Sequence, residues 1–239
     1  MNNLNIVLYS HSEYSDLWVP ALTRLQKHCK YSKIYFVVDK IIDDTISTFN
    51  VVPVFYDNNL HYNKRLLSAL MQIPEEYVLF LHEDMILYND VNNDLLKSHI
   101  DYMVNNKCDY IRLIKSGVKS NLQIIDGLYK IDSNDITFSI TPTVWSKKFL
   151  IDICTKTPPT SIWDFEINGE IYLKNKSFNG LYTHNINNQL RGQFHYDSNI
   201  FPHMCSAIFK GRWNMEYKLE LDELFSEFNI DKTLRGTIF

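Results

Sequence analysis

Apolar runs and segments of helical periodicity alternate along the first half of the chain. Five short apolar or β-branched runs predict strands, at residues 4–10, 33–38, 51–56, 77–84 and 109–114. Apolar side chains recur at helical spacing after residue 12, at 61–73 and at 92–106. This alternation is typical of a parallel sheet with right-handed crossovers. Pro53 favours an edge position for the third strand, because proline cannot donate a hydrogen bond to a sheet.

The second half of the chain has shorter elements. Its apolar runs predict strands at 122–125, 128–131, 136–140 and 205–210, with a hairpin turn at Asp126-Gly127. Helical patterns cover 146–154, a segment that begins near Ser161, and 217–228. No linker rich in Pro, Gly or Ser divides the chain. We therefore expect one domain over 1–239, with two halves of about 1–115 and about 116–239.

The run at 77–84 is apolar on both faces and ends in His82, Glu83 and Asp84. Such a run is typical of a central parallel strand covered by helices on both faces, and ligands bind beyond the carboxyl ends of these strands. Two adjacent carboxylates there repel each other unless a cation is bound, and a bound cation can hold a diphosphate. The alternative is an ordinary strand whose acids cap the next turn. We expect His82 to pack on the opposite strand face.

Composition narrows the function classes. The chain has 239 residues, of which 45% are hydrophobic and 22% charged, so it can bury a core. A net charge of −4 argues against a general nucleic-acid binder. The 4 cysteines form no C-x-x-C pair, which favours reduced thiols and a cytoplasmic location, in the host if the source is a virus. No apolar run approaches the roughly 20 residues of a membrane span, and no signal-peptide pattern opens the chain.

Several common nucleotide and metal motifs are missing: G-x-G-x-x-G, the P-loop and H-E-x-x-H. Polar groups at predicted strand ends remain as candidates for nucleotide binding, namely Ser10, Asp39 and Glu83. Lys64 and Arg65 could neutralise phosphate oxygens, or could be solvated helix cations. Arg212, in the turn Lys210-Gly211-Arg212-Trp213, could close over a diphosphate or belong to a plain surface turn.

Asp164 and Glu166 lie in the first turn of the helix that Ser161 is expected to cap. Residues two apart on a helix point about 200° apart, so only one of the two can face a given pocket. A carboxylate facing a cleft is a candidate general base, and we favour Asp164 while keeping Glu166 open. A late histidine could complete the coordination of a metal: His184, His195 or His203.

Six segments, in this order, resemble GT-A-type glycosyltransferases, in the group of short single-domain bacterial and large-virus enzymes: 14–18, 63–70, 77–84, 141–145, 163–166 and 211–213. The resemblance implies a UDP- or GDP-sugar donor at the strand ends and Mn²⁺ or Mg²⁺ bound by Glu83 and Asp84. It places the base of an inverting reaction on Asp164 or Glu166. The chain departs from the family in having His82-Glu83-Asp84 where D-x-D is usual.

The expected fold is therefore α/β: a GT-A-like Rossmannoid whose mostly parallel central sheet is flanked by helices, with a smaller mixed region on the acceptor side. The first half would bind the nucleotide and the second the acceptor. The expected function is transfer of a sugar to a glycan, glycolipid or protein acceptor, as in polysaccharide biosynthesis.

Three other functions are alternatives. A non-catalytic glycan-binding or assembly module is the main alternative. A nucleotidyltransferase would need a glycine-rich loop where the chain has Ser10-His11-Ser12-Glu13, and a metal-dependent hydrolase would need more than one acidic cluster. The sugar, the nucleotide, the acceptor, the stereochemistry and the oligomeric state stay open.

Overall fold

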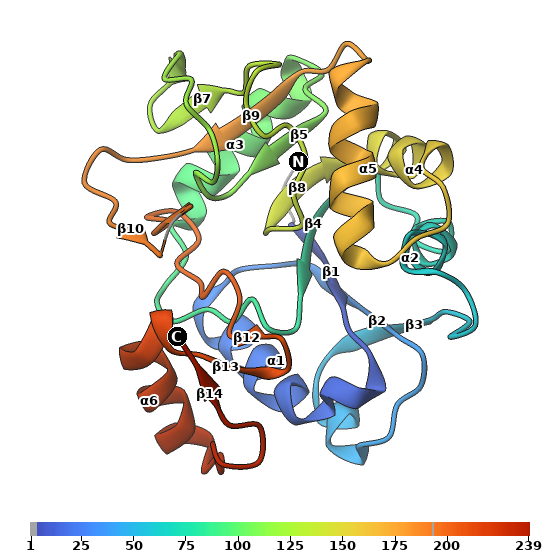
Figure 1. The fold of residues 1–239 in the computed structure, drawn as a ribbon, viewed down its shortest axis with the longest axis vertical. Helices are drawn as coiled ribbons and strands as arrows, with labels where there is room; N and C mark the ends of the chain where they lie inside the picture. Colours follow the sequence, from blue (N-terminus) through green and yellow to red (C-terminus); the bar gives the residue numbers. More distant parts are fainter. Residues whose placement is uncertain (1–3, 193) are drawn as a thin grey trace.

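The computed structural model describes residues 4–192 and 194–239. Its centre is a nine-stranded sheet in the order β3-β2-β1-β4-β8-β5-β9-β7-β6 (Figure 1). The strands span Asn5–Tyr9 (β1), Lys33–Val38 (β2), Val51–Phe55 (β3), Tyr77–His82 (β4), Tyr110–Arg112 (β5), Gln123–Ile125 (β6), Leu128–Lys130 (β7), Thr143–Ser146 (β8) and Gly180–Thr183 (β9).

A strand forms at each of the five runs that predicted one in the first half of the chain. β1 pairs in parallel with β2 and β4, and β2 pairs in parallel with β3, which forms the edge that Pro53 predicted. The expectation of parallel neighbours on both sides of β4 is wrong, because β8 inserts antiparallel between β4 and β5. Strand direction depends on which distant segment pairs with β4, and the local pattern of β4 carries no such information.

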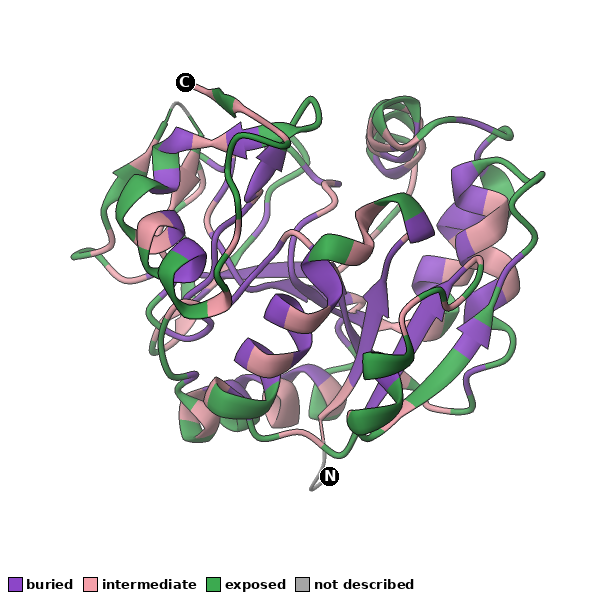
Figure 2. Cartoon of the chain, turned by 90° about the horizontal axis from the view of Figure 1, so that it is seen from below, coloured by how far each residue is buried: buried purple, intermediate pink, exposed green. Residues whose placement is uncertain are grey.

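The described chain contains six α-helices, of which α1 to α5 pack on the sheet: α1 (Trp18–His28), α2 (Tyr62–Leu70), α3 (Asn93–Asn105), α4 (Lys147–Lys156), α5 (Ile162–Lys174) and α6 (Lys218–Phe228). Successive β1 residues point to opposite faces. Ile6 and Leu8 pack in one core cluster with side chains of α1 and α3, whereas Val7 packs in another with side chains of α2, α4 and α5. Figure 2 shows the buried strands enclosed by helices whose outer faces are exposed.

The hairpin of β6 and β7 forms as predicted, and Gly127 has φ 67, a conformation that glycine adopts without steric cost. The strand expected at 136–140 is not formed. The backbone N–H groups of Thr137 and Phe138 donate instead to Glu170 Oε2, at 2.7 and 2.8 Å, and that of Ile140 donates to Glu166 Oε1 at 2.6 Å. Carboxylates of α5 thus take the place of a partner strand.

A smaller region completes the chain beside the sheet. The strand expected at 205–210 is shorter, Ile208–Phe209 (β12), and pairs with Arg212–Asn214 (β13), which also pairs with Thr237–Ile238 (β14). A two-residue ladder joins Leu190–Arg191 (β10) and His195–Tyr196 (β11). α6 and this region share a third core cluster, which includes Trp213 and Leu221. Within the described residues, the structure contains no helix long and apolar enough to cross a membrane.

Candidate functional site

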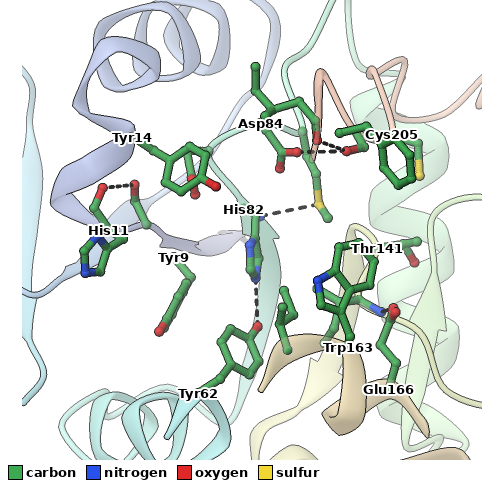
Figure 3. Close-up of a pocket in the computed structure, with 18 of the residues that line it drawn as sticks. Tyr9, His11, Tyr14, Tyr62, His82, Asp84, Thr141, Trp163, Glu166 and Cys205 are labelled. Atoms are coloured by element: carbon green, nitrogen blue, oxygen red, sulfur yellow. Dashed lines mark hydrogen bonds between the residues drawn. The ribbon is translucent and has the colours of Figure 1, made fainter. Parts of the chain in front are cut away.

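A cavity of about 1220 Å³ opens at the carboxyl ends of β1 and β4. Three parts of the chain line it: the residues that follow β1 and β4 with the start of α2, the start of α5 with residues 139–141, and the segment around β12. Figure 3 shows Asp84 and Glu166 on separate walls, one after β4 and the other on α5. This is the end of the sheet where ligands of open α/β folds bind.

Glu83 and Asp84 lie immediately after β4 and both line the cavity. Ser206 Oγ donates to Asp84 Oδ2 at 3.0 Å, which ties the end of β4 to the segment before β12. Burial raises the pKa of Asp84 to about 6. Burial, and then the charge of Asp84, raise the pKa of Glu83. Two ionised carboxylates are therefore costly here unless a positive charge joins them.

The acid pair, Glu83 and Asp84, fits a divalent cation. Glu83 is only 6% exposed, and its Oε2 is buried with no hydrogen-bond partner among the described residues, which leaves an oxygen free to bind a cation. No group of three or more His, Cys, Asp or Glu side chains in the described chain could hold a metal. Mg²⁺ often uses only one or two carboxylates and takes its other ligands from substrate phosphates and water. Two acids therefore fit an ion that binds together with a nucleotide.

The predicted histidine ligands do not gather at the acid pair. His195 lines the cavity, His203 Nδ1 bonds to the carbonyl oxygen of Phe201 at 2.6 Å, and His184 packs against Tyr196. His82, which was expected to pack away from the site, lines the cavity instead. Its Nε2 lies 2.8 Å from the hydroxyl of Tyr62, and burial lowers its pKa to about 3, so it is neutral.

On the α5 wall the structure separates the two candidate bases. Ser161 caps α5 by accepting a hydrogen bond from the backbone N–H of Asp164 at 3.2 Å, and its hydroxyl donates to Asp164 Oδ2 at 2.7 Å. Asp164 is exposed and is not part of the cavity wall, whereas Glu166 lines the cavity. Burial raises the pKa of Glu166, which shifts it towards the range of a general base.

One end of the cavity is formed by residues at the ends of β1 and β3. Ser10 lines it and accepts a hydrogen bond from Trp18 Nε1 at 2.7 Å. Tyr9 and Tyr56 stack with ring centres 5.3 Å apart, and both line the cavity. Asp39 does not line it but supports it, because its two carboxylate oxygens accept hydrogen bonds from the backbone N–H and the hydroxyl of Ser12, each at 2.7 Å.

Two predicted phosphate ligands lie elsewhere. Lys64 Nζ donates to the carbonyl oxygens of Cys154 and Thr157, at 2.8 and 3.2 Å, so it joins α2 to the end of α4. Arg212 is exposed on β13 and does not line the cavity. The neighbours of both residues do line it: Arg65 on α2, and Lys210 with Gly211 in the β12–β13 turn.

Comparison with solved structures addresses the fold. S. aureus TarS, residues 1–349, a protein of the GT-A glycosyltransferase class, matches with a TM-score of 0.54 and 13% identity over 98% of this chain and 68% of that chain. The same part of TarS in complex with UDP-GlcNAc matches with a TM-score of 0.49 and 15% identity, over 98% of this chain and 69% of that chain. CMP:2-keto-3-deoxy-manno-octonic acid synthetase complexed with CTP matches with a TM-score of 0.49 and 11% identity, over 75% of this chain and 88% of that chain.

The chain has a GT-A-like fold. Identities this low show the fold alone. No protein-family model and no curated protein matches the sequence.

With the GT-A-like fold confirmed, four cavity residues stand out for which the sequence predicted no role: Tyr14, Tyr62, Trp163 and Ser206. Aromatic residues carry no sequence signal that separates a cavity wall from a core. Trp163 had one usable signal, since it directly precedes Asp164 and lies three residues before Glu166 at the start of a predicted helix.

Proposed function

We propose that the chain is a glycosyltransferase that moves a sugar from a UDP- or GDP-linked donor to a glycan, glycolipid or protein acceptor. One observation carries the proposal: the acid pair after β4 and the carboxylate of Glu166 on α5 line the same cavity. The fold shared with TarS supports it, and TarS has been crystallised with UDP-GlcNAc.

The donor would lie along the ends of β1 and β4. Tyr9, Tyr56 and Ser10 line the part of the cavity that would take the nucleoside, and Asp39 holds the loop after β1 through Ser12. Glu83 and Asp84 would bind Mn²⁺ or Mg²⁺. Such an ion supplies positive charge to the diphosphate as it leaves. The orphaned Glu83 Oε2 and the raised pKa values of both acids support this assignment.

The acceptor would enter beside α5. Glu166 Oε1 is fixed by the Ile140 N–H, and Oε2 has no hydrogen-bond partner in the described part of the chain. In an inverting transfer, Glu166 takes the proton of the acceptor hydroxyl while that oxygen bonds to the anomeric carbon. The bond from this carbon to the diphosphate oxygen breaks through an oxocarbenium-like state. Asp164 is left out of this proposal, because Ser161 holds it in the helix cap.

The setting of the reaction is also part of the proposal. We place it in the cytoplasm and in polysaccharide biosynthesis, with residues 1–239 acting as one domain. The free and buried state of Cys29, Cys108, Cys154 and Cys205 supports a reducing compartment.

Calorimetry with UDP, GDP, UDP-sugars and GDP-sugars, with and without Mn²⁺, tests the proposal. We expect one nucleotide class to bind and Mn²⁺ to tighten it. Absence of nucleotide binding under every condition would refute the proposal and favour a glycan-binding module. Nucleotide binding without any turnover of a nucleotide sugar would favour a non-catalytic module that kept the donor site.

A further inference from the structure

Arg235 lies in the C-terminal segment that follows α6, yet it contacts the loop after β1. Its Nε donates to Asp16 Oδ2 at 2.6 Å, and its Nη2 donates to Asp16 Oδ1, so the two side chains form a forked ion pair. The guanidinium carbon lies 5.1 Å from the centre of the Tyr14 ring. Tyr14 lines the cavity. Arg235 therefore touches a side chain of the cavity wall.

The backbone around Arg235 is well anchored. Gly236 has φ 67, and its N–H donates to the carbonyl oxygen of Lys232 at 3.0 Å. The buried Trp213 donates its backbone N–H to the carbonyl oxygen of Gly236 at 3.0 Å, just before β13 and β14 pair. The side chain of Arg235 is only 17% exposed. The guanidinium is thus held at one place beside the cavity.

The ring on which Arg235 packs belongs to the same cavity as the acid pair, because Tyr14, Glu83 and Asp84 all line it. Arg65 and Lys210 are the long cations that line the cavity, and each already contacts another group. Arg65 donates to the carbonyl oxygen of Leu60 at 2.6 Å, and Lys210 lies 5.2 Å from the ring centre of Phe209.

Resting on the proposed function, we propose that Arg235 binds the diphosphate of the nucleotide donor, exchanging the carboxylate of Asp16 for phosphate oxygens. The arginine fork matches a phosphate as well as it matches a carboxylate. Asp16 is 49% exposed, so water solvates its carboxylate when Arg235 leaves, and no buried charge is stranded. The Tyr14 ring supports the guanidinium in both arrangements through a cation–π contact.

Binding of UDP and of uridine in the presence of Mn²⁺, read by ligand-observed NMR, tests this role. GDP and guanosine replace them if guanine nucleotides are the ones that bind. We expect Arg235→Gln to weaken UDP about tenfold or more, the range for a charge-assisted hydrogen-bonded contact, and to leave uridine unchanged. Arg235→Lys keeps the charge and should weaken UDP less. Arg212→Gln, on the neighbouring β13, is the matched control and should change neither ligand.

Asp16→Asn separates ligand binding from a structural role. If Arg235 exchanges partners, losing the competing carboxylate should tighten UDP several-fold, opposite in sign to Arg235→Gln. If the ion pair only holds the loop, both variants should weaken UDP and uridine together, which would overturn the inference. If wild type binds UDP and Arg235→Gln binds it with the same affinity, the inference about Arg235 is overturned while the proposed function stands. Failure of wild type to bind any nucleoside diphosphate would instead defeat the proposed function, and this inference with it.

Discussion

The backbone N–H of Ile140 donates to Glu166 Oε1 across 2.6 Å, so an acid on α5 anchors the segment that leads into β8. Glu170, one turn further along α5, anchors Thr137 and Phe138 in the same way. The carboxylate proposed as the base is therefore held by the backbone that forms one wall of the cavity. Its position does not depend on a flexible side-chain partner.

Replacing Glu166 by Gln should abolish most transfer without loss of donor binding. The amide keeps the size of the side chain but cannot take a proton, and general-base catalysis contributes about 10²- to 10⁴-fold in rate. We expect kcat to fall within that range while the Kd for the nucleotide stays the same. Asp164→Asn is the control, since Asp164 is exposed in the helix cap, and it should retain most activity. The reverse pattern would assign the base to Asp164.

The stability of the nucleotide-free protein should depend on the acid pair in a defined pH window. The pKa of Asp84 is raised from 3.8 to about 6, so the folded state holds this proton more tightly than the unfolded state does. The stabilisation is complete below about pH 4 and is lost as pH rises through about 6. Asp84→Asn resembles the protonated form, so its advantage over wild type should grow across this window, by on the order of 3 kcal/mol.

Chemical unfolding in EDTA from pH 4 to pH 8 measures this difference. Wild type and Asp84→Asn must be compared at each pH, because Asp39 contributes to the pH dependence in the opposite direction. Burial raises the pKa of Asp39, but the hydrogen bonds from Ser12 outweigh burial, so that the pKa is lowered. Parallel stability curves for the two proteins would show that Asp84 is not strained by its surroundings.

Metal binding should depend on the nucleotide. Only two acids are available to the ion from the cavity wall after β4, and an ion with so few protein ligands relies on phosphate oxygens. Mn²⁺ alone should bind weakly in electron paramagnetic resonance titrations, and UDP or GDP should tighten it at least about tenfold. Glu83→Gln should remove most of this synergy. Tight Mn²⁺ binding to the nucleotide-free protein would point to further ligands.

Trp163 should report occupancy of the cavity. It is 61% exposed at the cavity wall, whereas Trp18, Trp145 and Trp213 are buried. Ligand binding should change its fluorescence intensity or emission maximum, because the indole exchanges water for ligand. Trp163→Phe should lose the signal while calorimetry still detects the ligand. A signal that survives in Trp163→Phe would come from a buried tryptophan and would indicate a change in the core.

The sequence predicted the parts of the fold that depend on local pattern. β2 spans the predicted residues, and α3 differs from its prediction by one residue at each end, since apolar periodicity defines both. β8 and β9 were not predicted, because they are short and derive their character from the distant strands that they pair with. The segment 136–140 has strand-like residues, but its N–H groups bond to acids of α5.

The candidate site was likewise predictable only where it depends on local pattern. The acids after β4 follow from an apolar run that ends in carboxylates. The choice between Asp164 and Glu166 depends on the rotation of α5, which the burial of Phe165 in the core determines. Sequence spacing showed only that both acids could not face one pocket. The contact between Arg235 and Asp16 could not be predicted from local sequence pattern, because 219 positions separate the two residues.

Hydrolysis of UDP- and GDP-sugars without acceptor tests the central claim most directly, with wild type, Asp84→Ala and Asp57→Ala compared in Mn²⁺ and in EDTA. Asp57 also follows a strand but is exposed outside the cavity wall, which makes it the matched control. The account predicts slow, Mn²⁺-dependent release of nucleoside diphosphate by wild type and Asp57→Ala, and its loss in Asp84→Ala. Equal release by all three proteins, or release indifferent to Mn²⁺, would contradict the claim that the acids after β4 act on the leaving diphosphate.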